Sequence, residues 1–252
     1  MEKKRLKKRV DQLLVDRGLA ESRARAQAYI MAGAVFSGEK KILKAGQQLP
    51  EDAPLLVKSK DHPWVSRGGL KLVQAIEEFD LDVAGRTVID VGSSTGGFTD
   101  VCLHHGAEKV YAVDVGHGQL AWKLRKDERV VVLEKTNARY LTKEQIPDPV
   151  KMIVCDASFI GLQTVLPAAM ALAMPGCILV ALIKPQFEVG RGNVGKGGVV
   201  RDPALHTQVC EKIESWIRDD MDGWTVKGLT TSPIKGPEGN IEFLIIAEYE
   251  TC

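Results

Sequence analysis

The sequence of 252 residues is poor in cysteine, and no two of its cysteines have the spacing of metal ligands. The cysteines number five, which is odd. We therefore expect reduced, buried thiols, as in a cytoplasmic protein, and no bound metal. The five are Cys102, Cys155, Cys177, Cys210 and Cys252.

Long apolar runs are also lacking. The longest, from Ala168 to Ile183, is interrupted by Pro175-Gly176 and is shorter than the roughly 20 residues of a membrane-spanning helix. Near the N-terminus, Leu13-Leu14-Val15 is too short for the apolar part of a signal peptide. No internal repeat is evident. We expect a cytoplasmic protein that does not enter the membrane.

Net charge is small, at +1, but it is distributed unevenly. Residues 1–60 contain 14 Lys and Arg against 7 Asp and Glu, whereas the rest contains 20 against 26. Such a division predicts a basic module that contacts a polyanion, attached to an enzyme-like body. The alternative is a basic tail that is merely solvated.

The basic region has the pattern of a small α+β domain. A helix is predicted from Arg9 to Gly18, and a second from Ser22, a good N-cap, to about Met31. Short strands are predicted at 34–36 and 55–57, while residues 1–8 are expected to fray. We assign residues 1–60 to this domain and 61–66 to a linker.

The remainder, residues 67–252, alternates between strands and helices, which predicts an α/β fold with a doubly wound, Rossmann-like parallel sheet. A final strand at 242–247 would be antiparallel to the others. Strands are predicted near 87–91, 109–113, 130–133, 151–155 and 177–183, and helices at 69–79 and 204–219.

A glycine turn follows the first of these strands, and Asp114 ends the next strand about 20 residues later. This spacing is typical of an adenosine site in which the acid binds the ribose hydroxyls. Ser94 stands where a dinucleotide site needs its middle glycine, so a pyrophosphate would be crowded. S-adenosylmethionine, which has no phosphate, fits better. The alternative is a structural turn with an ordinary helix cap.

Four charged residues are expected at the same edge of the sheet. Lys184 follows seven apolar residues, and burial there would favour its neutral form. Asp156 ends another parallel strand, and Glu242 begins the antiparallel one, so both strands bring these acids to that edge. Lys71 lies on the helix before the first strand and could converge with them. Each alone could be a surface charge or a structural ion pair.

A second glycine-rich segment, Gly190 to Lys196, matches the phosphate-binding pattern G-x-x-x-x-G-K. Gly197 follows instead of the Ser or Thr that would hold magnesium. We therefore interpret residues 189–202 as a mobile basic lid or substrate-contact loop, the alternative being a merely flexible loop.

Eight short motifs are distributed along the sequence. They are Arg9-Val-Asp-Gln-Leu-Leu14, Ser22-Arg-Ala-Arg-Ala-Gln-Ala28, Ile30-Met-Ala-Gly-Ala-Val35, Ser66-Arg-Gly-Gly-Leu-Lys71, Asp90-Val-Gly-Ser-Ser-Thr-Gly-Gly-Phe-Thr99, Asp156-Ala-Ser-Phe-Ile160, Leu182-Ile-Lys-Pro-Gln-Phe-Glu188 and Gly239-Asn-Ile-Glu242. With the first three, residues 9–58 resemble the RNA-binding domain named after ribosomal protein S-four. With the other five, residues 64–250 resemble FtsJ-type ribose methyltransferases. The combination resembles the TlyA family, historically called hemolysin A.

The resemblance implies methylation of cytidine 2′-hydroxyls in ribosomal RNA with S-adenosylmethionine. The Lys-Asp-Lys-Glu tetrad of FtsJ-type enzymes corresponds here to Lys71, Asp156, Lys184 and Glu242. Lys184 is the candidate general base, although a free lysine has a pKa of about 10.4, which would have to fall to about 7. Alternatively, Lys184 stays charged and stabilises the developing alkoxide.

The remaining site residues fall into two groups. Many relatives have Ala in place of Ser93, a small change that leaves the cofactor interpretation intact. The cofactor group is Asp90, Gly92, Ser93, Ser94, Thr95, Gly96, Gly97, Phe98, Asp114, Asn137 and Asp156. The RNA-binding group, which would contact phosphates, is Arg5, Lys8, Arg9, Arg23, Arg25, Lys40, Lys41, Lys44 and Arg67.

Two other functions are considered. One is a membrane-damaging hemolysin, as the old family name suggests, but the sequence has no feature of a pore. The other is an RNA-binding protein whose methyltransferase half is catalytically idle, against which the intact tetrad argues. The partners expected are ribosomal RNA and the ribosomal subunits, and the sequence favours no particular oligomeric state.

Overall fold

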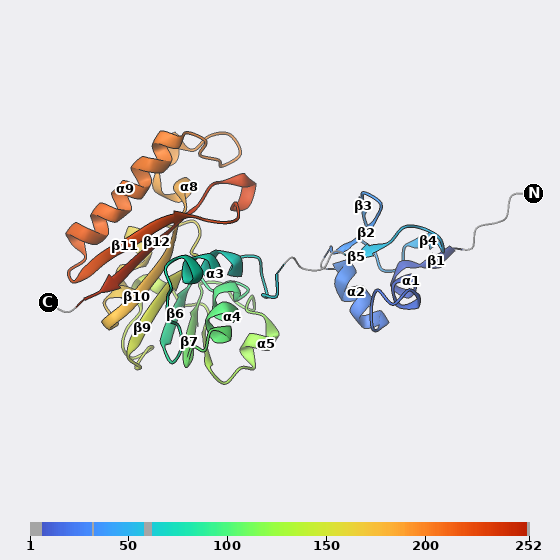
Figure 1. Cartoon of the computed structure of the whole chain (residues 1–252), viewed down its shortest axis with the longest axis horizontal. Coiled ribbons are helices and arrows are strands. Elements are labelled where there is room, and N and C mark those ends of the chain that lie inside the picture. The colour runs from blue at the N-terminus through green and yellow to red at the C-terminus, as the bar shows by residue number, and fades with distance from the viewer. Residues whose placement is uncertain (1–6, 32, 58–61, 251–252) are drawn as a thin grey trace, which may run out of the picture. The chain divides into compact units, whose positions relative to one another are not determined.

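The computed structural model describes residues 7–31, 33–57 and 62–250, and the chain forms two compact units, Met1–Pro63 and Trp64–Cys252 (Figure 1). The smaller unit packs two helices and short strands around a core that includes Val10, Leu14 and Ile30. Its elements are β1 (Lys7–Arg9), α1 (Val10–Asp16), α2 (Arg23–Met31), β2 (Val35–Ser37), β3 (Lys40–Lys41), β4 (Gln48–Pro50) and β5 (Leu56–Val57).

The helices of the smaller unit form where the sequence predicts them, and Ser22 Oγ accepts a hydrogen bond from the Arg25 amide at 3.2 Å. The prediction that residues 1–8 fray is wrong for Lys7 and Lys8, which belong to β1 and pair antiparallel with β4. Both strands are short and rich in polar residues or proline, so neither has the alternating apolar pattern of a strand.

The larger unit is built on a seven-stranded sheet in the order β11-β12-β10-β9-β6-β7-β8. The strands β6 to β10 pair in parallel, and β12 is antiparallel to both of its neighbours, β10 and β11. This confirms the predicted α/β class with one antiparallel strand. The strands are β6 (Thr87–Val91), β7 (Lys109–Val113), β8 (Val130–Leu133), β9 (Val150–Cys155), β10 (Ala173–Ile183), β11 (Trp224–Thr231) and β12 (Phe243–Tyr249).

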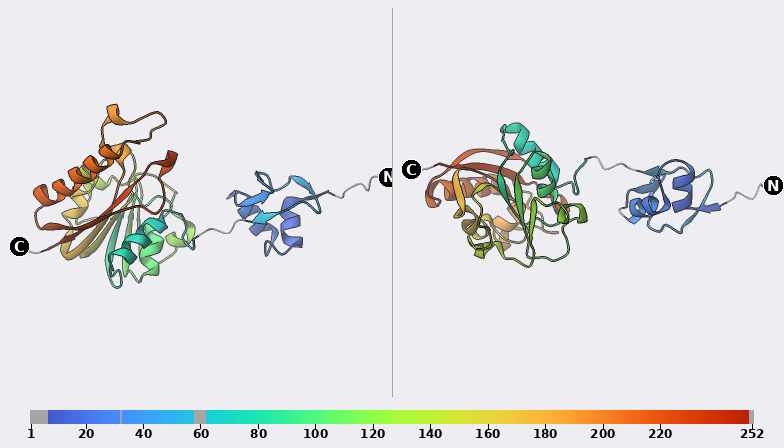
Figure 2. Two further views of the ribbon diagram at one scale, coloured as in Figure 1. Left: turned by 45° about the horizontal axis from the view of Figure 1, so that its top comes forward. Right: turned by 90° about the horizontal axis from the view of Figure 1, so that it is seen from below.

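Helices cover both faces of this sheet, as the views in Figure 2 show. Side chains from alternate strand positions form two cores: one packs under α3, α4 and α5, and the other under α6, α7 and α9. The helices are α3 (Gly69–Glu78), α4 (Gly97–His104), α5 (Trp122–Arg125), α6 (Leu162–Val165), α7 (Pro167–Met170), α8 (Pro185–Glu188) and α9 (Pro203–Asp220). Short 3₁₀ turns lie at Ala138–Tyr140, Arg191–Asn193 and Pro237–Gly239.

The boundary between the units differs slightly from the predicted linker, residues 61–66. Trp64 is buried in the core beneath α3, and the amide of Val65 donates a 2.8 Å hydrogen bond to Asp100 on α4. Residues 64–66 therefore pack with the larger unit, while residue 61 lies outside the described residues. Within the described ranges, every helix is too short or too polar to cross a bilayer, and the four described cysteines are free and buried.

Candidate active site

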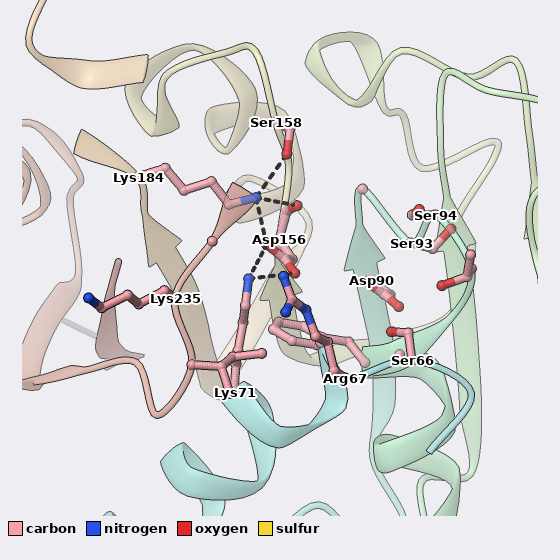
Figure 3. Close-up of a pocket in the computed structure, with 17 residues that line it drawn as sticks. Ser66, Arg67, Lys71, Asp90, Ser93, Ser94, Asp156, Ser158, Lys184 and Lys235 are labelled. Carbon is pink, nitrogen blue, oxygen red and sulfur yellow. Dashed lines mark hydrogen bonds and ion pairs between the residues drawn. The ribbon is translucent and has the colours of Figure 1, made fainter. Parts of the chain in front are cut away.

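The four charged residues of the predicted tetrad meet at one edge of the large sheet. Asp156 directly follows β9, and Lys184 directly follows β10. Glu242 directly precedes β12, and because that strand is antiparallel to β10 its start lies beside the end of β10. Lys71 reaches the same place from the first turns of α3 (Figure 3). The topology thus brings together residues that are far apart in the sequence.

Asp156 and Lys71 link the four side chains into a row. The Lys184 Nζ lies 2.6 Å from Oδ1 of Asp156, and the Lys71 Nζ lies 3.2 Å from its Oδ2. On its other side, Lys71 Nζ lies 2.8 Å from Oε2 of Glu242. Two lysines and two acids therefore alternate along this row, so each lysine lies beside a group that can carry the opposite charge.

Burial explains why the charges alternate. Lys71 is 6% exposed, Lys184 is 5% exposed and Glu242 is fully buried, so an unpaired charge at any of these positions would be strongly unfavourable. The angles at Glu242 do not satisfy a hydrogen bond, and the contact with Lys71 is an ion pair. Only Asp156, with 22% of its side chain exposed, is substantially open to the adjoining pocket.

Ser158 is a contact of the lysine that the sequence interpretation missed. Its Oγ lies 2.9 Å from Lys184 Nζ, and the backbone oxygen of Asp156 lies 3.0 Å from the same nitrogen. Together with the Asp156 carboxylate, these groups give Nζ three oxygen neighbours and fix its position. The sequence could have pointed to Ser158, because this serine lies two residues after Asp156 in the same motif.

Two adjoining hollows open beside the tetrad. The first, of about 260 Å³, is lined by Lys71, Lys184 and the first part of the glycine turn. The second, of about 440 Å³, is lined by Asp114, Asn137 and Phe159. Residues common to both are Gly92, Ser94, Asp156 and Ser158. A ligand in the second hollow would therefore lie against Asp156 and would reach the two lysines through the first.

Of the residues predicted to bind a cofactor, all but one line these hollows. The exception is Gly96, against which Leu120 and Leu124 pack instead. Gly92 has φ of +79°, and a Cβ there would lie 2.8 Å from the α-carbon of Ala157. Any side chain at Gly92 would thus be strained and would push the Asp156 segment away from the turn.

Asp114 shapes the glycine turn from the end of β7. Its Oδ2 accepts a 2.8 Å hydrogen bond from the Ser94 amide, and its Oδ1 accepts one of 2.6 Å from the Gly116 amide. Ser94 has φ of +47°, an uncommon conformation for serine, which this hydrogen bond helps to hold. The carboxylate keeps acceptor capacity for ribose hydroxyls and also holds the turn in place.

Asp90 provides a test of whether the pocket suits the predicted cofactor. Its Oδ2 accepts hydrogen bonds from the amide and hydroxyl of Thr99, at 2.9 and 2.6 Å. Its Oδ1 is buried and has no partner within the described residues. Burial raises the pKa of this carboxyl to about 7. A buried acceptor without a donor suits the amino group of an amino acid tail, so the residues fit S-adenosylmethionine.

The predicted RNA-binding residues of the smaller unit differ in how free they are. Lys8 is paired with Asp16 at 3.0 Å and with Glu51 at 3.3 Å. By contrast, Lys40, Lys41 and Lys44 are exposed, and no acid within the described residues pairs with them. Arg5 lies outside the described residues. The three exposed lysines are therefore the freest cations of this set.

Arg9 and Arg23 share one buried acid. The carboxylate of Asp11, on α1, accepts hydrogen bonds from Arg9 at 2.9 and 3.0 Å and from Arg23 at 3.1 Å. Gln27 donates to the same carboxylate at 3.1 Å. The Arg9 guanidinium, above all, holds the pKa of Asp11 well below its usual range. The two arginines are thus fixed side by side and remain about half exposed.

Arg25 and Arg67, the remaining predicted RNA contacts, lie in the smaller and the larger unit respectively. Arg25 lies over the Tyr29 ring, with its Cζ 5.2 Å from the ring centroid. Arg67 is exposed and lines the first hollow.

Phe159, which the sequence interpretation did not single out, is 89% exposed beside the second hollow and has φ of +67°. The available signal was an aromatic residue directly after the serine of the Asp156–Ile160 motif.

The second glycine-rich segment is tied down at its C-terminal end. Asn240 accepts a 3.1 Å hydrogen bond from the Val200 amide and donates one of 2.9 Å to the carbonyl of Gly198. Asn240 lies two residues before Glu242, so the end of this loop is anchored next to the tetrad. The part from Gly190 to Lys196 remains a proposed substrate-contact loop.

Comparison with known proteins agrees with this geometry. Residues 64–249 match the FtsJ-like methyltransferase family and residues 8–53 match the S4 domain. The chain is 51% identical to YqxC of Bacillus subtilis, described as a candidate rRNA methyltransferase, over 95% of this chain and 85% of that protein. It is 48% identical to the 16S/23S rRNA (cytidine-2′-O)-methyltransferase TlyA of Mycobacterium tuberculosis, over 96% and 90%. A solved structure of a candidate hemolysin from Streptococcus thermophilus is 43% identical, with a TM-score of 0.75 over 98% of this chain and 90% of that one.

Proposed function

The chain belongs to the FtsJ-like methyltransferases of the TlyA type, and from this premise we propose that it methylates cytidine ribose 2′-hydroxyls of ribosomal RNA. S-adenosylmethionine is the proposed methyl donor, and the S4 domain is the proposed RNA-binding module. The observation that supports this most is the row formed by Lys71, Asp156, Lys184 and Glu242 beside the glycine turn. Whole ribosomal subunits are the proposed physical partners.

Several residues would hold the donor. The ribose would bind at Asp114, the adenine side near Asn137, and the amino acid tail at the unpaired oxygen of Asp90. When bound, S-adenosylmethionine supplies a methyl group on a positively charged sulfur that an oxygen can attack. All further chemistry falls to the protein's own side chains, because a ribose hydroxyl is a poor nucleophile until its proton is removed.

Lys184 is the proposed acceptor of that proton. As a neutral amine, its two hydrogens would face the carboxylate and the backbone oxygen of Asp156. The lone pair would then be left for the hydroxyl of Ser158, which the substrate 2′-hydroxyl displaces. As the methyl group passes from the sulfur, which would keep the bonding electron pair, to the 2′-oxygen, Nζ would take up the hydroxyl proton, and Asp156 would stabilise the resulting ammonium. Lys71 and Glu242 hold Asp156 in place.

The first experiment replaces the proposed base. Lys184→Ala should abolish methyl transfer to ribosomal RNA, while calorimetry should show S-adenosylmethionine binding within a few-fold of the wild type. The matched control is Lys151→Ala, an exposed lysine on the same sheet, which should retain activity. Near wild-type methylation by Lys184→Ala would refute the role of the lysine.

A second variant separates the neutral base from a charged stabiliser. Arginine keeps its charge at every working pH, so Lys184→Arg cannot accept a proton. We expect it to be inactive from pH 7 to 10, whereas partial activity would favour electrostatic stabilisation of the alkoxide.

Mass-spectrometric mapping of ribose methylation, in cells with and without the gene, tests the function as a whole and identifies the nucleotide.

A further inference from the structure

An exposed tryptophan lies next to the glycine turn and has no role in the chemistry described above. Trp122, the first residue of α5, is 69% exposed. The other three tryptophans of the chain, Trp64, Trp216 and Trp224, are at most 8% exposed. Tryptophan is enriched at binding surfaces, because its ring is apolar and its N–H group is polar.

The position of Trp122 is fixed by the cofactor turn. The amide of Ala121 donates a 3.2 Å hydrogen bond to the carbonyl of Thr95. Leu120 and Leu124 are buried against Gly96, so this side of α5 faces the turn. The backbone next to Trp122 is therefore anchored to the glycine turn, and its side chain is exposed whereas the two leucines are buried.

The charges around Trp122 indicate the kind of partner. Lys126 lies over the indole, with Nζ 4.9 Å from the ring centroid, and no acid within the described residues forms an ion pair with it. Lys123 and Arg125 flank the ring on α5, and although they pair with Asp100 and Glu134, they add to the basic character of the helix. A rigid aromatic face beside a free cation suits a nucleic acid base and its phosphate.

We propose that Trp122 and Lys126 form a stacking platform for an unpaired base of the substrate RNA, next to the methylated nucleotide. This inference rests on the proposed function, because it assumes that RNA enters the first hollow past the glycine turn. The base stacks on the indole, and Lys126 contacts the phosphate attached to it. The platform contributes to RNA affinity and takes no part in the methyl transfer.

Intrinsic fluorescence of the full-length protein gives a direct test, because Trp122 is the exposed indole. An unmethylated transcript of 16S or 23S rRNA should quench the wild-type emission and protect it from acrylamide. Trp122→Phe should lack this response, since its remaining tryptophans are buried. If wild type and Trp122→Phe respond identically to the transcript, the proposal is overturned.

Kinetics on the same transcripts provide the second test. Trp122→Ala should raise the KM for RNA by roughly 5- to 150-fold, the range expected for the loss of one stacked base, and leave S-adenosylmethionine binding unchanged. Trp122→Phe should recover most of the affinity. The matched control is Met174→Ala, an exposed apolar residue near the start of β10, at the opposite end of the strand from Lys184.

The outcomes separate this inference from the proposed function. If the wild type methylates the transcript but Trp122→Ala has an unchanged KM, the platform is refuted and the methyltransferase function stands. If the wild type methylates no ribosomal RNA, the proposed function itself fails. An indole that acrylamide cannot reach in the free protein would show that another part of the chain covers Trp122, which would also overturn the proposal.

Discussion

Among single residues, Asp90 links the cofactor site to pH. Its pKa in the free protein is raised to about 7 by burial, and its Oδ1 has no partner within the described part of the chain. A cationic amino group bound there would favour the ionised carboxylate. Affinity for S-adenosylmethionine should therefore rise as the pH increases from about 5 to 7 and then level off.

Calorimetry can measure this linkage directly. At pH 6, binding should release a proton, so the apparent enthalpy should depend on the ionisation enthalpy of the buffer. Asp90→Asn should bind more weakly and without this dependence. Binding by the wild type that is independent of the buffer would contradict the assignment.

The Asp90 carboxyl binds a proton more readily in the folded state than in the unfolded state. It should therefore also make the free protein less stable as the pH rises from about 4 to 7.

Ser158 allows a second prediction at this scale. Its hydroxyl is one of three oxygens that position the Lys184 nitrogen, and it touches no other part of the tetrad. Because the substrate hydroxyl takes its place beside Nζ in the proposed mechanism, Ser158→Ala should leave single-turnover methyl transfer within a few-fold of the wild type at saturating RNA and cofactor. A loss of about 10- to 100-fold, corresponding to a hydrogen bond of about 1.5–3 kcal/mol, would show instead that the serine stays bonded to Nζ during the transfer.

On the scale of secondary structure elements, the α1–α2 pair organises the basic surface of the smaller unit. Asp11 on α1 is fully buried and binds Arg9 and Arg23 at once. Removing its charge makes the protein more positive, which by simple electrostatics would strengthen RNA binding. We expect the opposite, because the two guanidinium groups lose the acid that orients them.

Asp11→Asn should weaken RNA binding by about 5- to 10-fold, corresponding to about 1–1.4 kcal/mol for losing the orientation of two phosphate contacts. Asp16→Asn, on the same helix, makes the same charge change but leaves Lys8 paired with Glu51 alone, and should bind equally well or more tightly. Filter binding measures both, and hydrogen exchange over residues 10–31 verifies that the helices remain folded. Tighter binding by Asp11→Asn would refute the orienting role.

The elements also show which parts of the fold could be predicted from sequence. Strands β6 to β9 match their predicted positions within one residue, because each is a short apolar run that ends in a turn. Strand β11 was not predicted: only one of its eight residues is buried, and a register shift between Val226 and Gly228 interrupts its pattern. The short helices α5 to α8 were missed because four residues show no helical period.

The sequence likewise predicted part of the candidate site and missed the rest. The tetrad came from motif resemblance and from strand ends that share an edge, which is a topological argument. That Asp11 captures Arg9 and Arg23 could not be foreseen, since it depends on how α1 packs against α2. The same holds for Lys8, whose partner Glu51 is 43 residues away in the sequence.

At the scale of the whole molecule, the core of the smaller unit is separate from the two cores of the larger unit, which implies two folding units. All four tryptophans lie in residues 64–252, so fluorescence reports on the larger unit alone. In urea, S-adenosylmethionine at 100 times its Kd should stabilise that unit by about 2.7 kcal/mol. Hydrogen exchange in the smaller unit should not change, and equal protection of both would contradict their independence.

The dependence of RNA affinity on salt concentration measures how many Lys and Arg side chains contact phosphates. Arg25, Lys40, Lys41 and Lys44 are the predicted contacts of the smaller unit that no acid pairs with within its described residues. About four contacts on single-stranded RNA predict a loss of affinity of about 50-fold between 50 and 200 mM salt, far less than if every predicted residue took part. A salt-insensitive affinity would refute the electrostatic account, and a loss above a thousandfold would show that the paired arginines and lysines also bind.

The placement of β12 has a consequence for protein synthesis. This strand is the last of the described chain, yet it lies between β10 and β11, and the residue before it is Glu242. A ribosome must therefore translate through β12 before the sheet can close and the fourth charge can reach Lys71. A premature stop codon between α9 and Glu242 should leave neither a stable sheet nor a complete row of charges, so such nonsense mutations should behave as null alleles even though most of the sheet has been made.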